Sequence, residues 1–115
     1  MQRMLMLAAV TSANRHQVMA DIDDATVGCG GWIEGHTLFS NIMVTFRFVV
    51  PAGRLAEFAA RVNEAGVHLD PASLAAVSER TGAEVAPQAE LPGALAVTFI
   101  HDEPDLRREV PAVPG

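Results

Sequence analysis

One segment, residues 42–50, alternates strictly between two sets of side chains, and this pattern constrains the fold more than any other feature of the sequence. Side chains along a β-strand point in turn to the two faces of a sheet, so a period of two predicts a strand. One face receives only apolar side chains: Ile42, Val44, Phe46, Phe48 and Val50. The other face receives Met43, Thr45, Arg47 and Val49. Because the first face must be buried, the chain has to supply a layer that covers it.

Two stretches have the spacing of amphipathic helices and can supply that layer. Within residues 15–27 and 55–65, apolar residues recur three and four positions apart, which places them along one side of a helix. A short third helix is predicted to begin with Asp70 as its N-cap and Pro71 at its first position. Gly82 is expected to end this helix.

Three further segments have the composition of strands, namely residues 4–11, 32–40 and 95–100. Residues 67–69 are expected to form a brief extended link between helices. Residues 83–93 are punctuated by Pro, Gly and Glu and are expected to form a loop.

The order of these elements predicts a known arrangement of layers. Two βαβ halves with right-handed crossovers place both long helices on the same face of a sheet. We therefore predict an α+β, ferredoxin-like βαββαβ sandwich. It would have a four-stranded antiparallel sheet with the first and third strands central, two long helices on one face and a short extra helix. We expect a single domain over residues 1–101 and a loosely ordered, Pro-rich tail over residues 102–115.

The predicted sheet face opposite the helices is apolar. Half of the residues are hydrophobic and the mean hydropathy is +0.22. The outward residues of the last two long strands include Met43, Val49 and Ile100, and Arg47 is the only charged residue among them. Surplus apolar surface on a small domain is typically buried between subunits. We therefore expect the chain to partner itself, as a homodimer or a higher homo-oligomer.

The charge composition argues against two classes of partner. The formal net charge is −6 and the isoelectric point is about 5.0. The eight basic residues are all Arg and are scattered along the chain. Nucleic acids and anionic membrane surfaces attract clustered positive charge, so neither is an expected partner.

We expect a cytoplasmic protein. Cys29 is the only cysteine, so the chain needs no oxidising compartment. No apolar run approaches the roughly 20 residues that span a bilayer. Arg3 and the apolar run that follows it superficially resemble a signal peptide, but the run is at the lower limit for such a segment. The strand interpretation is favoured.

No pattern in the sequence predicts a cofactor, a metal site or a catalytic group. The three aspartates within residues 21–24 lie on a predicted helix, where a solvated acidic face is favoured over a cation site. The four histidines fall in different elements and lack the short spacing of zinc ligands. Cys29 follows a helix C-terminus, where the helix dipole should raise the pKa of a thiol, so it is not expected to be a nucleophile.

Three segments of the first half suggest a family. They are the first strand, the turn Thr11-Ser12-Ala13-Asn14-Arg15, and the run Gly28-Cys29-Gly30-Gly31-Trp32-Ile33-Glu34. Over roughly residues 4–66 the chain resembles an ACT-type regulatory domain. The acidic-x-Pro-Gly signature of that family is replaced here by Asn14-Arg15-His16-Gln17. The resemblance implies a βαββαβ unit that dimerises and binds an amino acid or another small metabolite near the first strand–helix turn.

The candidate ligand-binding residues are therefore Ser12, Asn14, Arg15 and His16. Backbone N–H groups at a helix start favour anions, and an arginine can hold a carboxylate through two hydrogen bonds. The predicted function is a dimeric small-molecule-sensing or regulatory domain that binds an amino acid or another carboxylate metabolite, and a non-catalytic role is favoured.

The alternative function is an enzyme of the dimeric α/β-barrel type, similar to small monooxygenases. In such proteins two sheets close face to face around an apolar cavity. The geometry of the dimer separates the two predictions, since edge-to-edge pairing of the sheets would support regulation and face-to-face closure would support the enzyme.

Overall fold

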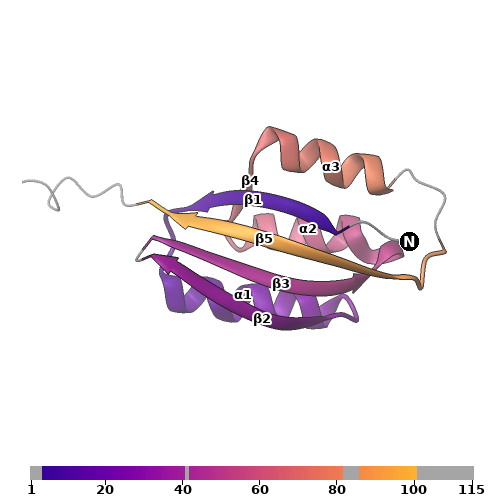
Figure 1. Cartoon of the computed structure of the whole chain (residues 1–115), viewed down its shortest axis with the longest axis horizontal. Coiled ribbons are helices and arrows are strands. Elements are labelled where there is room, and N and C mark those ends of the chain that lie inside the picture. The colour runs from indigo at the N-terminus through magenta and orange to yellow at the C-terminus, as the bar shows by residue number, and fades with distance from the viewer. Residues whose placement is uncertain (1–3, 41, 82–85, 101–115) are drawn as a thin grey trace, which may run out of the picture.

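The computed structural model describes residues 4–40, 42–81 and 86–100, which form a mixed five-stranded sheet with helices packed against it (Figure 1). The elements in chain order are β1 (Leu5–Thr11), α1 (Arg15–Gly28), β2 (Trp32–Ser40), β3 (Met43–Pro51), the short 3₁₀ helix η1 (Ala52–Arg54), α2 (Leu55–Glu64), β4 (His68–Leu69), α3 (Pro71–Thr81) and β5 (Glu90–Phe99). The predicted tail, residues 102–115, lies outside the described residues.

The order of the strands corrects the predicted topology. The sheet runs β2-β3-β5-β1-β4. β5 lies between β3 and β1, antiparallel to β3 and parallel to β1. The α+β class is confirmed, but the four-stranded antiparallel, ferredoxin-like sheet with the first and third strands central is wrong.

Two misinterpreted segments account for this difference. β5 begins at Glu90 and includes Pro92 and Gly93, which as turn signals predicted a loop. Gly93 pairs with Leu5 and with Phe48, and a Cβ at Gly93 would run into the Phe48 ring. This glycine therefore permits a close approach of three strands rather than a turn.

The expected extended link is also a strand. His68 and Leu69 form β4 and pair with Val10 and Ala9 on the outer side of β1. Two residues of pairing are enough to place this segment in the sheet and to fix the start of α3 beside β1.

α3 closes the rest of the β1 edge, along which it lies in Figure 1. The backbone N–H of Ala8 donates to Ser73 Oγ at 2.8 Å, and the Ala8 carbonyl accepts from the Asp70 N–H at 3.0 Å. Asp70 Oδ1 also accepts from the Ser73 N–H, which confirms the predicted N-cap. The polar backbone groups of this edge are thus satisfied by a helix instead of a long neighbouring strand.

The core lies between the sheet and the helices α1 and α2, which cover one of its faces (Figure 1). The predicted core face of β3 is confirmed, since Val44, Phe46, Phe48 and Val50 are all buried, but Val49 of the predicted outward face is buried as well. The rings of Phe48 and Phe58 lie 4.7 Å apart between centroids, a favourable distance for aromatic packing. Ile42 departs from the prediction, because it precedes β3 and is 49% exposed.

We predict that Gly93→Ala destabilises the protein by about 1–3 kcal/mol, the usual cost of an overpacked core. The added methyl group would overlap the buried Phe48 ring. Gly28→Ala is the matched control, because its nearest neighbour is the flexible end of the Arg61 side chain and alanine favours a helix. Urea unfolding gives the midpoint of each variant and of the wild type. A Gly93→Ala midpoint equal to that of Gly28→Ala would contradict the packing described for β5.

Candidate functional site

The predicted site residues Ser12, Asn14, Arg15 and His16 lie where β1 leads into α1. Asn14 is the N-cap of α1, and its Oδ1 accepts from the backbone N–H groups of His16 at 2.8 Å and Gln17 at 3.2 Å. These N–H groups are the donors that an anion at the helix start would use. The cap therefore occupies much of the predicted anion site.

The other predicted residues of this turn have different surroundings. The Arg15 guanidinium lies over the Phe99 ring, 5.9 Å from its centroid, which is within the range of a cation–π contact. The side chains of Ser12 and His16 are exposed. The turn thus offers two exposed polar side chains beside an asparagine and an arginine that already have partners.

The second candidate is the sheet face that α1 and α2 leave uncovered, which we call the open face. Cross-strand partners share a face of a sheet, so the pairing register identifies its members. They are Trp32, Gly35, Thr37 and Ser40 on β2; Met43, Thr45, Arg47, Val49 and Pro51 on β3; Glu90, Pro92, Ala94, Ala96 and Thr98 on β5; Met6, Ala8 and Val10 on β1; and His68 on β4.

Arg47 lies at the middle of the open face. It is the central residue of β3, with Gly35 beside it on β2 and Ala94 on β5. Its side chain extends over Gly35, because a Cβ there would come within 2.5 Å of Arg47 Nη2. The only carboxylate among the paired residues of this face is Glu90, at the beginning of β5.

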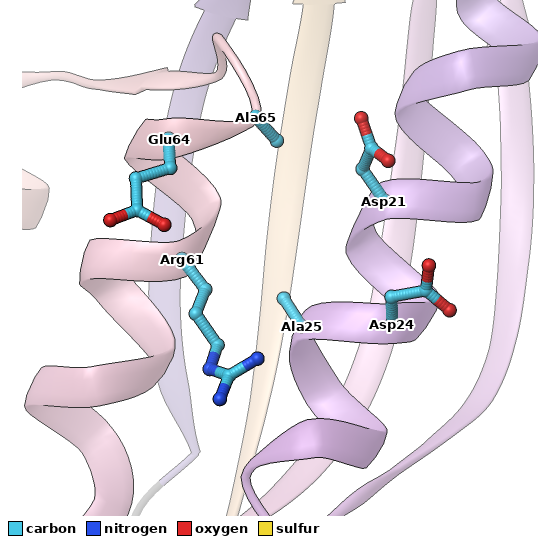
Figure 2. Close-up of a pocket in the computed structure, with 6 residues that line it drawn as sticks. All are labelled: Asp21, Asp24, Ala25, Arg61, Glu64 and Ala65. Carbon is cyan, nitrogen blue, oxygen red and sulfur yellow. The ribbon is translucent and has the colours of Figure 1, made fainter.

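A third candidate is an open groove of about 240 Å³ between α1 and α2, shown in Figure 2. Asp21 and Asp24 line it from α1, and Arg61 and Glu64 line it from α2. Across the residues with described positions, no group of three or more His, Cys, Asp or Glu side chains could hold a metal ion. Three carboxylates and one guanidinium thus line this groove.

Arg61 in this groove belongs to an ion network that joins the two helices. Glu57 accepts from Arg54 Nε at 2.6 Å through one carboxylate oxygen and pairs with Arg61 Nη2 at 2.9 Å through the other. Arg54 Nη2 also donates to the Gly28 carbonyl at 3.3 Å, at the C-terminus of α1 where positive charge is favourable. The spacing of Glu57 and Arg61 was visible in the sequence, but the role of Arg54 depends on the contact with α1.

The network shifts the pKa values of two nearby groups. Hydrogen bonds from Arg54 and Arg61 lower the pKa of Glu57 from 4.5 to about 2. Burial raises the pKa of the Cys29 thiol, and the charge of Glu57 adds to this rise while Arg61 and Arg54 oppose it. The prediction that Cys29 is not an activated nucleophile agrees with this direction.

No family model, curated protein or solved structure matches this chain. None of the described helices is long and apolar enough to cross a membrane. Functional inference therefore depends on the geometry of the sites themselves.

We predict that Glu57→Gln reduces the loss of stability in acid. The folded-state pKa of Glu57 is about 2, below its ordinary value of 4.5. Its contribution to folding stability is therefore complete above the ordinary pKa and is lost as the pH falls through the folded-state pKa. Urea unfolding between about pH 5 and pH 2 should show a smaller decline for the variant than for the wild type.

Glu64→Gln is the matched control for this measurement. Glu64 lies on the same helix but forms no ion pair with any residue of described position. An equal decline for the wild type and Glu57→Gln would show that the network does not stabilise the fold.

Proposed function

We propose that this protein is a homodimeric sensing or regulatory module that binds a small organic carboxylate on the open face, with Arg47 as the group that holds the carboxylate. The observation that supports this proposal most strongly is the single cation at the centre of a largely uncharged, apolar sheet face. A cytoplasmic location is part of the proposal, since the one free cysteine, Cys29, needs no oxidising compartment.

The chemistry of Arg47 favours a carboxylate ligand. Its planar guanidinium can donate two parallel hydrogen bonds to a carboxylate. The ion pairs formed between described residues involve Arg54 and Arg61, not Arg47. Gly35 leaves the space into which the guanidinium extends. The neighbours Ala94 and Met6 would contact the apolar part of a ligand.

The turn of Ser12, Asn14, Arg15 and His16 stays the alternative location for the ligand. The open face is favoured because Asn14 already bonds the N–H groups of His16 and Gln17. Arg15 already lies against Phe99. The regulatory role implied by the ACT-type resemblance is kept as part of this proposal, although the ferredoxin-like sheet that it also implied is not present.

The apolar open face also favours a second candidate, the enzyme of the dimeric α/β-barrel type. Two such faces would enclose a cavity from which water is excluded, a setting that suits catalysis as well as binding. A binding module releases its ligand unchanged, whereas an enzyme converts it. Because an enclosed cavity suits both functions, face-to-face packing no longer separates them as expected from the sequence, and chromatography of a recovered ligand does so instead.

We predict that 2-naphthoate, a flat aryl carboxylate, binds the wild-type protein and that Arg47→Gln weakens its binding roughly tenfold or more. Bonds to a charged group typically contribute about 1.5–3 kcal/mol, and the glutamine removes the charge while keeping most of the side chain. Isothermal titration calorimetry measures the affinity. The uncharged 2-naphthalenemethanol is the control ligand, and its affinity should hardly change.

Arg15→Gln is the control variant for this titration, because it removes an arginine from the other candidate location. Weaker binding of 2-naphthoate to Arg15→Gln, with full affinity in Arg47→Gln, would overturn the proposed site and support the turn. Equal affinity in both variants and the wild type would overturn both locations.

A further inference from the structure

The two long edges of the sheet differ in what they offer to a partner. The β1 edge is occupied by β4 and α3, which use the backbone groups of Ala8. The β2 edge is free in the described structure, but its pairing register shifts between Ile33 and Gly35 and again between Leu38 and Ser40. Irregular edge strands pair poorly with another strand. Edge-to-edge addition of a second sheet is thus hindered on both sides.

The open face presents large apolar side chains to solvent. Met6 is 67% exposed and Trp32 is 42% exposed, and both point away from the helices. Val10 and Met43 extend the same surface toward the other end of the strands. Exposed apolar side chains gathered on one face of a sheet are typical of an interface.

The distribution of charge indicates which partner this face suits. The chain has a net charge of −6, whereas the open face has one cation, Arg47, and one carboxylate, Glu90. Acidic side chains such as Asp21 and Asp24 lie in the helix layer instead (Figure 2). Two copies of an acidic protein meet with least repulsion through a face without net charge.

The dimensions of the strands give an estimate of the area that the open face could bury. Four strands about 4.8 Å apart and roughly eight residues long, at about 3.3 Å per residue, give roughly 500 Å² in projection. Side-chain relief makes the accessible area larger than the projection, and standard interfaces bury about 800 Å² per partner. A dimer approaches that size only if it uses the whole face.

We infer that a second copy of this chain covers the open face, so that two sheets pack face to face with Met6 and Trp32 in the contact. The interface is isologous, with the same residues supplied by each copy. Arg47 of each copy is then enclosed, and a buried charge without a partner is costly. The inference rests on the proposed function in one respect, since the proposed carboxylate ligand is the partner of the enclosed Arg47. The contact between the two copies can be measured without that ligand.

Sedimentation equilibrium of the full chain at micromolar concentrations tests the inference with three variants that each add one carboxylate. Met6→Glu lies on the open face, Phe39→Glu on the β2 edge and Leu74→Glu on α3, at positions that are 67%, 64% and 53% exposed in the wild type. The wild type should be a dimer. Met6→Glu should weaken its association by roughly a hundredfold or more, because each copy would bury an added carboxylate in the contact. Val10→Glu, which lies farther from Arg47 along the strands, should weaken it as well. Phe39→Glu and Leu74→Glu should associate as the wild type does.

Two further measurements and one further variant keep the result interpretable. Far-UV circular dichroism shows whether Met6→Glu is folded, and Val10→Glu repeats the test at a second position on the open face. Trp32 is the only tryptophan, so its fluorescence emission should shift to longer wavelength when the wild-type dimer is diluted to monomers.

A monomeric wild type would overturn the inference. So would dissociation by Phe39→Glu or Leu74→Glu with the open-face variants still dimeric, which would assign the contact to the β2 edge or to α3. A dimer that fails to bind 2-naphthoate counts against the proposed function alone. A monomer that binds it counts against the face-to-face contact and the homodimeric state, but not against Arg47 as the ligand site.

Discussion

The pairing of β5 between β1 and β3 is the constraint on which the rest of the structure depends. It joins the strand before α1 to the strand before α2, so both helices pack on one continuous layer. β5 suits a central position because its buried residues Leu91, Leu95 and Val97 face the core. Gly93 leaves room for the Phe48 ring, which lies over it on the core side of the sheet. With β5 in the middle, β1 lies farther from the centre of the sheet than predicted. Its outer edge is covered by β4 and α3.

The same arrangement produces the candidate site. Because α1 and α2 occupy one face, the pairing of four long strands leaves a second face without a helical cover (Figure 1). Arg47 lies at the centre of this face, and Gly35 gives its side chain room. The ion network of Arg54, Glu57 and Arg61 lies on the opposite side of the sheet, where it joins α2 to the end of α1. The ion network and the proposed ligand site therefore lie on opposite sides of the sheet.

Local sequence patterns predicted which segments form helices and strands better than they predicted which strands lie side by side in the sheet. The period of two in residues 42–50 identified β3 and placed Arg47 outward, and Asp70 was recognised as the cap of α3. The position of β5 could not be read in the same way, because strand pairing joins residues far apart in the chain. Pro92 and Gly93 act as turn signals locally, and only contact with Phe48 reveals the strand role of Gly93. Asn14 was predicted as a ligand-binding residue, and only the structure shows that its side chain accepts from the N–H groups that an anion would need.

Nuclear Overhauser effects between main-chain protons of neighbouring strands test the central position of β5 most directly. The structure predicts that Thr98 gives contacts to Met43 on one side and to Val10 on the other. It also predicts that no main-chain contacts connect β1 with β3, since the β5 ladder separates them. Direct contacts between β1 and β3, with β5 at an edge of the sheet, would restore the ferredoxin-like order and contradict the account of the open face given above.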